Sequence, residues 1–229
     1  MDKKELQNPA LYTNRELSWL LFNKRVLSEA RDKQLLLFER LKFLSITASN
    51  LDEFFMVRIG SLVDMIHAEY TKKDIAGMSA KEQLDALMEE THKFAALQYS
   101  TYNRMLLPQL RANGLNFVEH HEQLTERQAQ YVDEYFEENV YPVLTPMAVD
   151  SSRPFPLIRN KTLNIGALVA KKGEKDTEIE FATVQVPSVL PRVVRIPAAK
   201  EGDTEVAVLL LEEIIERNMD KLFLNYDIV

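Results

Sequence analysis

The chain has 229 residues, 46% of them hydrophobic and 28% charged, and its formal net charge is −7 at pH 7. It shows no run of about 18 apolar residues and no apolar signal core near its start, so we expect a cytoplasmic protein without a membrane span. The absence of cysteine excludes disulfides and cysteine-ligated metals, and the acidic balance argues against a nucleic-acid-binding module.

The amino-terminal half carries the start signals and the apolar spacing of helices. Residues Thr13–Glu16 and Ser79–Glu82 both have the capping-box pattern, in which a hydroxyl and a carboxylate satisfy each other's backbone donors. Apolar residues at helical spacing recur in "LLLFERLKFLSI", residues 35–46. A further stripe follows Asn50, at Leu51, Phe55, Ile59, Leu62 and Ile66. We therefore predict an all-helical bundle over residues 1–112.

The character of the sequence changes at Gly114, which is a good helix stop. A short strand is predicted at 115–118, and Thr125 opens another capping box and helix. The proline-rich residues 140–160 predict an extended, stiff connection. Three strands and a strand-to-helix passage are predicted beyond it, at 162–170, 180–187, 191–197 and 207–219.

Residues 113–229 thus have the pattern of a mixed α/β head domain, and the fold class predicted for the whole chain is α+β. The last residues, "LFLNYDIV", are apolar and aromatic. Because chains commonly end in frayed polar residues, we expect this second domain to be truncated at its carboxy-terminal end.

Asn50 in "ITASNLDEFFMVR" has two interpretations. Asparagine is among the best helix N-caps, and Asn50-Leu51-Asp52-Glu53 resembles a capping box, with two acids that complement the helix dipole. Alternatively, its amide, which both donates and accepts hydrogen bonds, faces a nucleotide. The chemistry of the residue alone favours the cap.

Basic residues and histidines offer weaker candidates. Arg58 follows Asn50 by two helical turns and either reaches an anion or pairs with a carboxylate, of which the pairing is the commoner arrangement. Three cations flank the proline run and are expected to form a solvated rim: Arg153, Arg159 and Lys161. The histidines are expected to be solvated rather than nucleophiles or metal ligands, because no H-x-x-x-H pair is present: His67, His92, His120 and His121. No phosphate loop or dinucleotide fingerprint occurs.

Three ordered blocks carry a more specific signal. They are "NRELSWLLFNKRVLSEA" (14–30), "ERLKFLSITASNLDEFFMVRIGSL" (39–62) and "YPVLTPMAVDSSRPFPLIRNKTLNIGALV" (141–169). Together they resemble the amino-terminal part of bacterial polyphosphate kinase, the type with phospholipase-D-like catalytic domains. The resemblance covers nearly all of this chain but only the front portion of the family's sequence.

The resemblance implies an enzyme that reversibly transfers the terminal phosphoryl group of ATP to polyphosphate, with Mg²⁺ and through a phosphohistidine. In the family, the phosphorylated histidine and the magnesium-binding positions lie in carboxy-terminal domains. No catalytic residue and no metal ligand is therefore carried over to this chain, and the chain alone is expected to be inactive.

The resemblance also implies roles for the two domains. The helical domain covers the nucleotide pocket, and the head domain takes part in forming a homodimer or a higher homo-oligomer. The family's ATP-contacting asparagine matches Asn50, which reverses the preference for a plain cap. Arg58 is expected to support the wall of the nucleotide pocket to which Asn50 belongs. ATP and polyphosphate are the implied partners. Association of the intact enzyme with a membrane, including a peripheral place at the inner membrane, stays open.

The alternative is a non-catalytic dimerisation or scaffold module, in which Asn50 only caps a helix. The two hypotheses differ in the expected effect of substituting Asn50. If the domain forms a wall of the nucleotide pocket, the full-length enzyme loses activity without losing stability. If it is a scaffold, activity and stability are lost together, or neither is lost.

Overall fold

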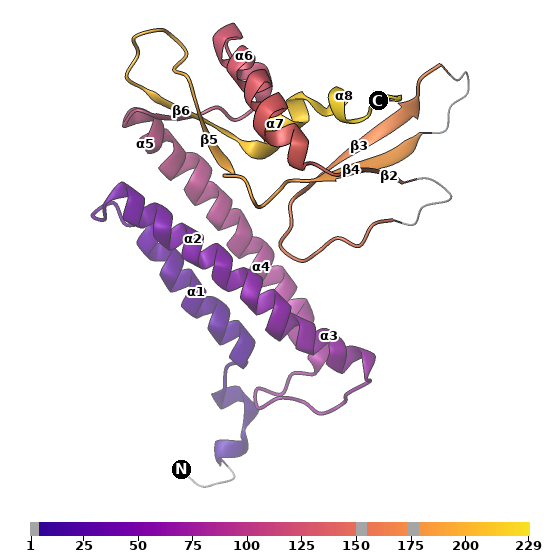
Figure 1. The fold of residues 1–229 in the computed structure, drawn as a ribbon. Helices are drawn as coiled ribbons and strands as arrows, with labels where there is room; N and C mark the ends of the chain where they lie inside the picture. The colour runs from indigo at the N-terminus through magenta and orange to yellow at the C-terminus, as the bar shows by residue number, and fades with distance from the viewer. Residues whose placement is uncertain (1–4, 150–154, 174–178) are drawn as a thin grey trace. The chain divides into compact units, whose positions relative to one another are not determined.

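A computed structural model describes residues 5–149, 155–173 and 179–229. The chain divides into two compact units, Met1–Leu110 and Arg111–Val229. The first unit is helical and the second combines sheets with short helices (Figure 1), which confirms the predicted α+β class. The domain boundary that we predicted after residue 112 lies at the end of helix α5 and stays a proposal. In the described part of the chain, no helix has the length and apolar character needed to cross a bilayer.

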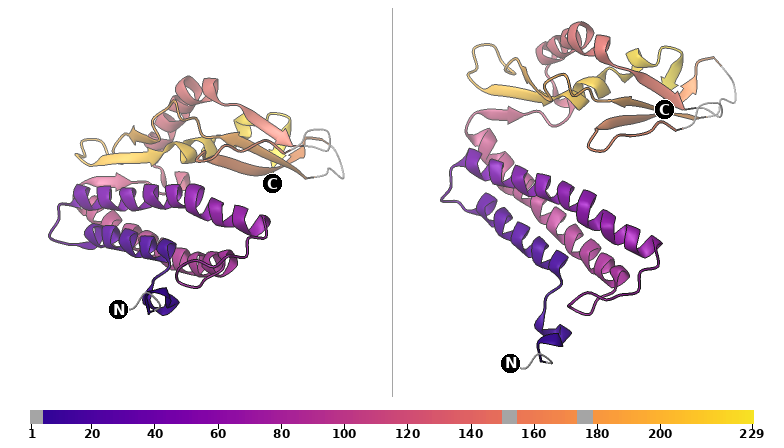
Figure 2. Two further views of the ribbon diagram at one scale, coloured as in Figure 1. Left: turned by 90° about the horizontal axis from the view of Figure 1, so that it is seen from below. Right: turned by 60° about the horizontal axis from the view of Figure 1, so that its bottom comes forward.

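The first unit is a bundle of long helices preceded by two short 3-10 turns, η1 (Glu5–Gln7) and η2 (Pro9–Leu11). The helices are α1 (Arg15–Arg31), α2 (Leu37–Phe54), α3 (Gly60–His67), α4 (Ala80–Thr101) and α5 (Leu107–Ala112). π-helical turns join α2 to α3 and α4 to α5; they are η3 (Phe55–Ile59) and η4 (Tyr102–Leu106). Helices α1, α2 and α4 run side by side in both views of Figure 2, and α1 packs against both of the others.

The interpretation of Asn50 as a helix N-cap is wrong. Helix α2 begins at Leu37 and continues through Asn50 to Phe54, so that Asn50 lies inside the helix. The backbone stays in the right-handed helical region at Phe54 and Phe55 and through to Gly60. The two helices that the sequence suggested, one over 35–46 and one after Asn50, are therefore parts of one continuous helical rod.

The π turn η3 explains why the predicted apolar stripe is wrong at one position. Phe55 is 36% exposed, whereas its neighbour Phe54 is 2% exposed and stacks on Trp19, with ring centroids 4.3 Å apart. The next buried residue is Ile59, five positions after Phe54. A π turn holds one residue more than an α turn, so buried positions across it are five apart instead of the three or four that an α-helix predicts.

The helix starts were predicted with mixed success. The capping box at Ser79 is confirmed, because its side chain accepts from the Glu82 N–H and the Glu82 carboxylate accepts from the Ser79 N–H. The box at Thr13 is wrong, because the cap of α1 is Asn14, whose Oδ1 accepts from the N–H groups of Glu16 and Leu17 at 3.0 Å each. Asparagine caps helices as well as threonine does, and the two candidates are adjacent in the sequence.

The second unit contains strands β1 (Leu115–Phe117), β2 (Pro146–Val149), β3 (Asn164–Lys171), β4 (Glu180–Gln185), β5 (Val193–Ile196), β6 (Val206–Leu210) and β7 (Tyr226–Ile228). Its helices are α6 (Glu126–Tyr135), α7 (Leu211–Arg217) and α8 (Met219–Leu222). The described part of this unit also contains the short turns η5 (His121–Gln123), η6 (the π turn Phe136–Val140) and η7 (Tyr141–Val143). The strands predicted at 115–118, 162–170, 180–187, 191–197 and the passage at 207–219 are confirmed.

The strands form two sheets. One has the order β1-β6-β5, with β1 parallel and β5 antiparallel to β6. The other is antiparallel and has the order β2-β4-β3-β7. Helices α6 and α7 lie on the same side of the strands (Figure 2), and their buried residues share one apolar cluster with both sheets. The sheet faces under these helices therefore contribute to a single core.

The prediction of an extended connection over 140–160 is wrong in part, because Tyr141–Val143 form the 3-10 turn η7. Residues Pro146–Val149 form strand β2, which pairs with β4, and Pro154 lies outside the described residues. Pro146 is the first residue of a strand at the edge of its sheet, where a missing N–H removes no interior ladder bond. Gly114 precedes β1 with φ of +80°, a conformation that suits glycine after a helix end.

Candidate functional site

Asn50 is held by a second asparagine on the neighbouring helix. Its Nδ2 donates to Oδ1 of Asn23 at 3.0 Å, and Asn23 Nδ2 donates to the carbonyl oxygen of Thr47 at 3.1 Å. Asn23 is fully buried between α1 and α2, so both of its amide groups are used inside the bundle. Among the described residues no donor reaches Oδ1 of Asn50. That oxygen, on a half-buried side chain, is available to a ligand.

The asparagine pair belongs to a larger polar network. Thr47 is buried, its hydroxyl donates to the Leu44 carbonyl at 2.7 Å, and it accepts from Gln98 Nε2 at 2.9 Å. The network therefore connects α1, α2 and α4. A buried polar group without a partner is costly, whereas a satisfied network fixes the positions of its members. The network therefore holds the Asn50 amide in one orientation, unlike a side chain that moves freely at the surface.

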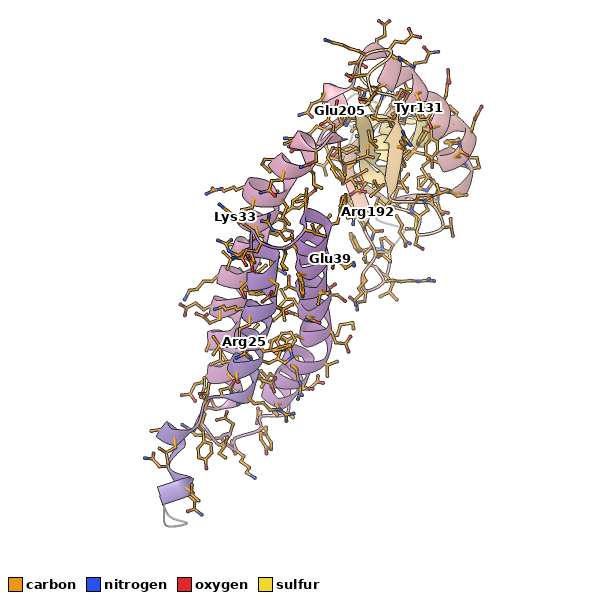
Figure 3. All side chains as sticks on the ribbon, turned by 90° about the vertical axis from the view of Figure 1, so that its left-hand side faces the viewer. Arg25, Lys33, Glu39, Tyr131, Arg192 and Glu205 are labelled. Carbon is orange, nitrogen blue, oxygen red and sulfur yellow. The ribbon has the colours of Figure 1, made fainter. Side chains whose placement is uncertain are left out.

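The exposed residues near the asparagine pair along the two helices are both apolar and charged, and Glu53, one turn after Asn50, is among the charged ones. Ile46 lies one helical turn before Asn50 on α2 and is 43% exposed, and Phe22, next to Asn23 on α1, is 46% exposed. The Arg25 guanidinium, labelled in Figure 3, lies over the Phe22 ring at 5.9 Å from its centroid.

A separate hollow of about 250 Å³ lies between α2 and α4 and is lined by Leu44, Ala48, Gln98, Tyr99 and Tyr102. Ala48 and Asn50 are two positions apart, and residues at that spacing do not face the same way on a helix. The hollow is therefore connected to the asparagine network through Gln98 but does not contain the Asn50 amide.

Arg58 pairs with a carboxylate, as the sequence favoured. Its Nη1 lies 3.6 Å from Oε1 of Glu16, in the first turn of α1. The Glu16 side chain is 14% exposed and that of Arg58 is 41% exposed, so the guanidinium keeps donors that face solvent. Arg58 lies within η3, and the ion pair fixes this π turn to the start of α1.

Two features of the bundle escaped the sequence reasoning. Asn23 stands at the helical spacing of Leu20 and Leu27 on the buried face of α1, and that position was the signal that could have found it. Arg40 is 2% exposed; its Nε donates to the Ala30 carbonyl at 3.0 Å and its Nη1 to Gln109 Oε1 at 2.9 Å. It therefore ties the end of α1 to the start of α2 and to α5.

The histidines are not brought together with Asn50. His67 and His92 are exposed on α3 and α4, and His120 has a 65% exposed side chain, as expected of solvated residues. The expectation is wrong for His121, whose side chain is 20% exposed and lies against Glu213. Arg159 and Lys161 are exposed, as predicted, and Arg153 lies outside the described residues.

Comparison with known proteins accounts for nearly the whole chain. Residues 12–118 match the family model of the polyphosphate kinase N-terminal domain, and residues 127–229 match that of the polyphosphate kinase middle domain. The chain belongs to the polyphosphate kinase family. The resemblance seen in the three sequence blocks is thereby confirmed.

Individual relatives give the extent of the match. The polyphosphate kinase of Lactiplantibacillus plantarum is 50% identical over 217 residues, which are 95% of this chain and 29% of the relative. That of Halalkalibacterium halodurans is 44% identical over 225 residues, 98% of this chain and 31% of the relative. The crystal structure of polyphosphate kinase from Porphyromonas gingivalis matches with a TM-score of 0.82 at 30% identity, over 95% of this chain and 31% of that one. The chain spans less than a third of the length of these polyphosphate kinases.

Proposed function

We propose that this chain is the amino-terminal part of a polyphosphate kinase that reversibly transfers the terminal phosphoryl group of ATP to polyphosphate. The observation that carries the proposal is the match of two consecutive family domains, in order, to residues 12–118 and 127–229. The phosphohistidine of the reaction lies outside this chain. The 229-residue chain incubated alone with radiolabelled ATP is therefore expected to yield no acid-insoluble polymer.

The charge of the chain supports the placement of the catalytic groups outside this chain. Phosphoryl transfer requires cations and donors that stabilise the charge spread over the transferred group. A chain of net charge −7 without a phosphate loop is poorly suited to supply them. Within the described residues, the one group with metal-ligand spacing contains an imidazole: His121 with Glu213 and Glu216. Mg²⁺ prefers oxygen ligands in an octahedral arrangement, so this group does not fit the Mg²⁺ of the reaction, whose ligands lie elsewhere in the enzyme.

Within this enzyme, Asn50 contacts the base or sugar side of ATP. The support is its half-buried amide, oriented by Asn23, with Oδ1 free of other described donors. Arg58 stabilises the same wall through Glu16, because the ion pair holds the π turn that follows Asn50. The second unit is the head domain and takes part in forming the homo-oligomer.

The test is a comparison of Asn50→Ala with Asn23→Ala in the complete enzyme. Both variants lose the hydrogen bond between the two asparagines, but only Asn50→Ala removes the amide that faces the nucleotide. Loss of one ligand hydrogen bond is worth roughly 0.5–1.5 kcal/mol, up to about tenfold in affinity. Asn50→Ala should raise KM for ATP several-fold more than Asn23→Ala does, and leave KM for polyphosphate unchanged in the reverse reaction.

Ser49→Ala is the matched control, because Ser49 is an exposed neighbour on the same helix. It should behave as the unmodified enzyme. If Asn50→Ala and Asn23→Ala change KM for ATP and the melting temperature equally, Asn50 is a packing residue, and the non-catalytic scaffold becomes the better description of the helical unit.

A further inference from the structure

The second unit brings a histidine and two carboxylates together from distant parts of the chain. The backbone N–H of His121, at the start of η5, donates to Oε2 of Glu213 at 2.9 Å. Glu213 and Glu216 are three positions apart on α7, which places them on one face of that helix. A nitrogen of His121 and one oxygen of each glutamate all lie within 4.8 Å of one another.

The distances suit two ligands of one metal ion better than a tight hydrogen bond. The His121 Nδ1 lies 3.4 Å from Glu213 Oε2, and the His120 Nδ1 lies 3.7 Å from Glu213 Oε1. Hydrogen bonds between charged partners are shorter, about 2.7–2.9 Å. Nitrogen and oxygen ligands about 2.0–2.2 Å from a tetrahedral zinc ion are roughly 3.3–3.6 Å apart. The His121–Glu213 distance of 3.4 Å fits this range, and the His120–Glu213 distance of 3.7 Å slightly exceeds it.

The cluster combines an exposed carboxylate, Glu216, with the less exposed Glu213, and Oε1 of Glu122 lies 3.6 Å from the other ring nitrogen of His121. In the described part of the chain neither Glu213 nor Glu216 pairs with a lysine or an arginine, and the Glu213 side chain is only 14% exposed. The nearby cations are taken by other partners. Arg192 binds Glu212 through three contacts of 2.6–3.1 Å, and Arg217 binds Asp133 at 2.8 and 3.0 Å.

We propose that His121, Glu213 and Glu216 bind a divalent transition-metal ion of the zinc class. An imidazole with carboxylates suits Zn²⁺, Co²⁺ or Ni²⁺ and disfavours Mg²⁺ and Ca²⁺, which take oxygen ligands. His120, whose ring faces the other oxygen of Glu213, is placed to supply a fourth ligand. The ion fastens η5 to α7 and so stabilises the second unit. This site is separate from the Mg²⁺ of the proposed phosphoryl transfer and does not depend on it.

Calorimetric titration of the metal-free 229-residue chain with ZnCl₂ tests the site. We expect one saturable Zn²⁺ per chain and a melting temperature that rises by several degrees with Zn²⁺, because a ligand that binds only the folded state stabilises it. Glu213→Gln should weaken binding at least tenfold. The glutamine keeps an oxygen that accepts the His121 N–H, so the local fold is retained while the carboxylate ligand is lost. His121→Gln is a second, independent variant with the same expected result.

The matched control is His92→Gln. His92 is exposed on α4, and its Nδ1 lies 2.7 Å from the Met88 carbonyl of its own helix, so the variant should bind Zn²⁺ as the parent does. The absence of cysteine removes competing thiolates. The proposal is overturned if the parent shows no saturable binding of Zn²⁺, or if Glu213→Gln and His121→Gln bind it as tightly as the parent and His92→Gln.

Discussion

Replacing Asn23 with alanine tests whether the asparagine network stabilises the helical bundle. The variant removes two hydrogen bonds at a fully buried position, from Asn50 at 3.0 Å and to the Thr47 carbonyl at 3.1 Å. Each bond contributes about 1 kcal/mol net. Alanine is the better helix former by about 0.6 kcal/mol, which offsets part of the loss. The free energy of unfolding should therefore fall by about 1.5 kcal/mol. It should fall further if the neighbouring side chains do not fill the volume that the asparagine leaves.

The assay uses the single tryptophan of the chain. Trp19 stacks on Phe54 inside the first unit, so its fluorescence reports the unfolding of the helical bundle and not of the second unit. With a urea dependence of about 1–2 kcal/mol per molar for a unit of this size, the midpoint should fall by roughly 1 M. Glu29→Ala, an exposed site on the same helix, should leave the midpoint almost unchanged.

A double-mutant cycle isolates the bond between the two asparagines. Asn23→Ala and Asn50→Ala together should destabilise the bundle by about 1 kcal/mol less than the sum of the single variants, because both remove the same interaction. An Asn23→Ala midpoint equal to that of Glu29→Ala would refute the reasoning, since the network would then contribute nothing to stability.

Two further predictions concern glycine sites and acid stability. Gly166→Ala should destabilise the second unit by about 1 kcal/mol, because the new Cβ would lie 2.9 Å from the Phe181 ring. Gly60→Ala, whose new Cβ would have its nearest contact at 3.8 Å, should stabilise its helix by up to about 1 kcal/mol. Melting temperatures of the two variants test both predictions. The hydrogen bond from Arg217 lowers the pKa of Asp133, so its contribution is present at neutral pH and is lost as the pH falls through that lowered value. At neutral pH, Asp133→Asn should lower the free energy of unfolding by up to about 1 kcal/mol, which is the range of a partly exposed ion pair. In strong acid, the free energy of unfolding of the variant should equal that of the parent.

Local signals were the part of the fold that the sequence predicted well. The capping boxes at Ser79 and Thr125 are both present, and each lies within four residues, although the same pattern at Thr13 gave the wrong cap residue by one position. The apolar side predicted for the helix after Thr125 is correct at Val132, Phe136 and Val140, which are buried, and wrong at Tyr131, which is 38% exposed. These features depend on neighbours along the chain, so sequence spacing is sufficient to find them.

The errors arose where distant residues decide the local structure. The π turn at Phe55–Ile59 changes the spacing of buried positions, and periodicity in a single sequence does not reveal it. Strand β2 forms because β4 offers it a partner, although proline and isolated β-branched residues gave no strand pattern. Strand β7 was missed for the same reason, since its partner is β3.

The candidate sites show the same limit. The resemblance pointed to Asn50, but the support of its amide by Asn23 depends on how α1 packs against α2. His121 was expected to be solvated because its sequence neighbours are polar. Its partner Glu213 lies on helix α7, 92 residues later in the chain, and the sequence contains no local signal for a contact between them.

The parallel pairing of β1 with β6 has a consequence for the order in which the chain is assembled during synthesis. Leu115 pairs with Val206 and Phe117 with Val208, so β1 leaves the ribosome long before β6, its only partner strand among the described residues, is made. Helix α1 packs against α2 and α4 within the first unit, Met1–Leu110, so this unit can fold while the rest is translated. The second unit completes its fold later, because pairing between residues far apart in the sequence has a high entropic cost. Misfolding during translation should therefore begin at the unpaired β1 edge rather than in the helices.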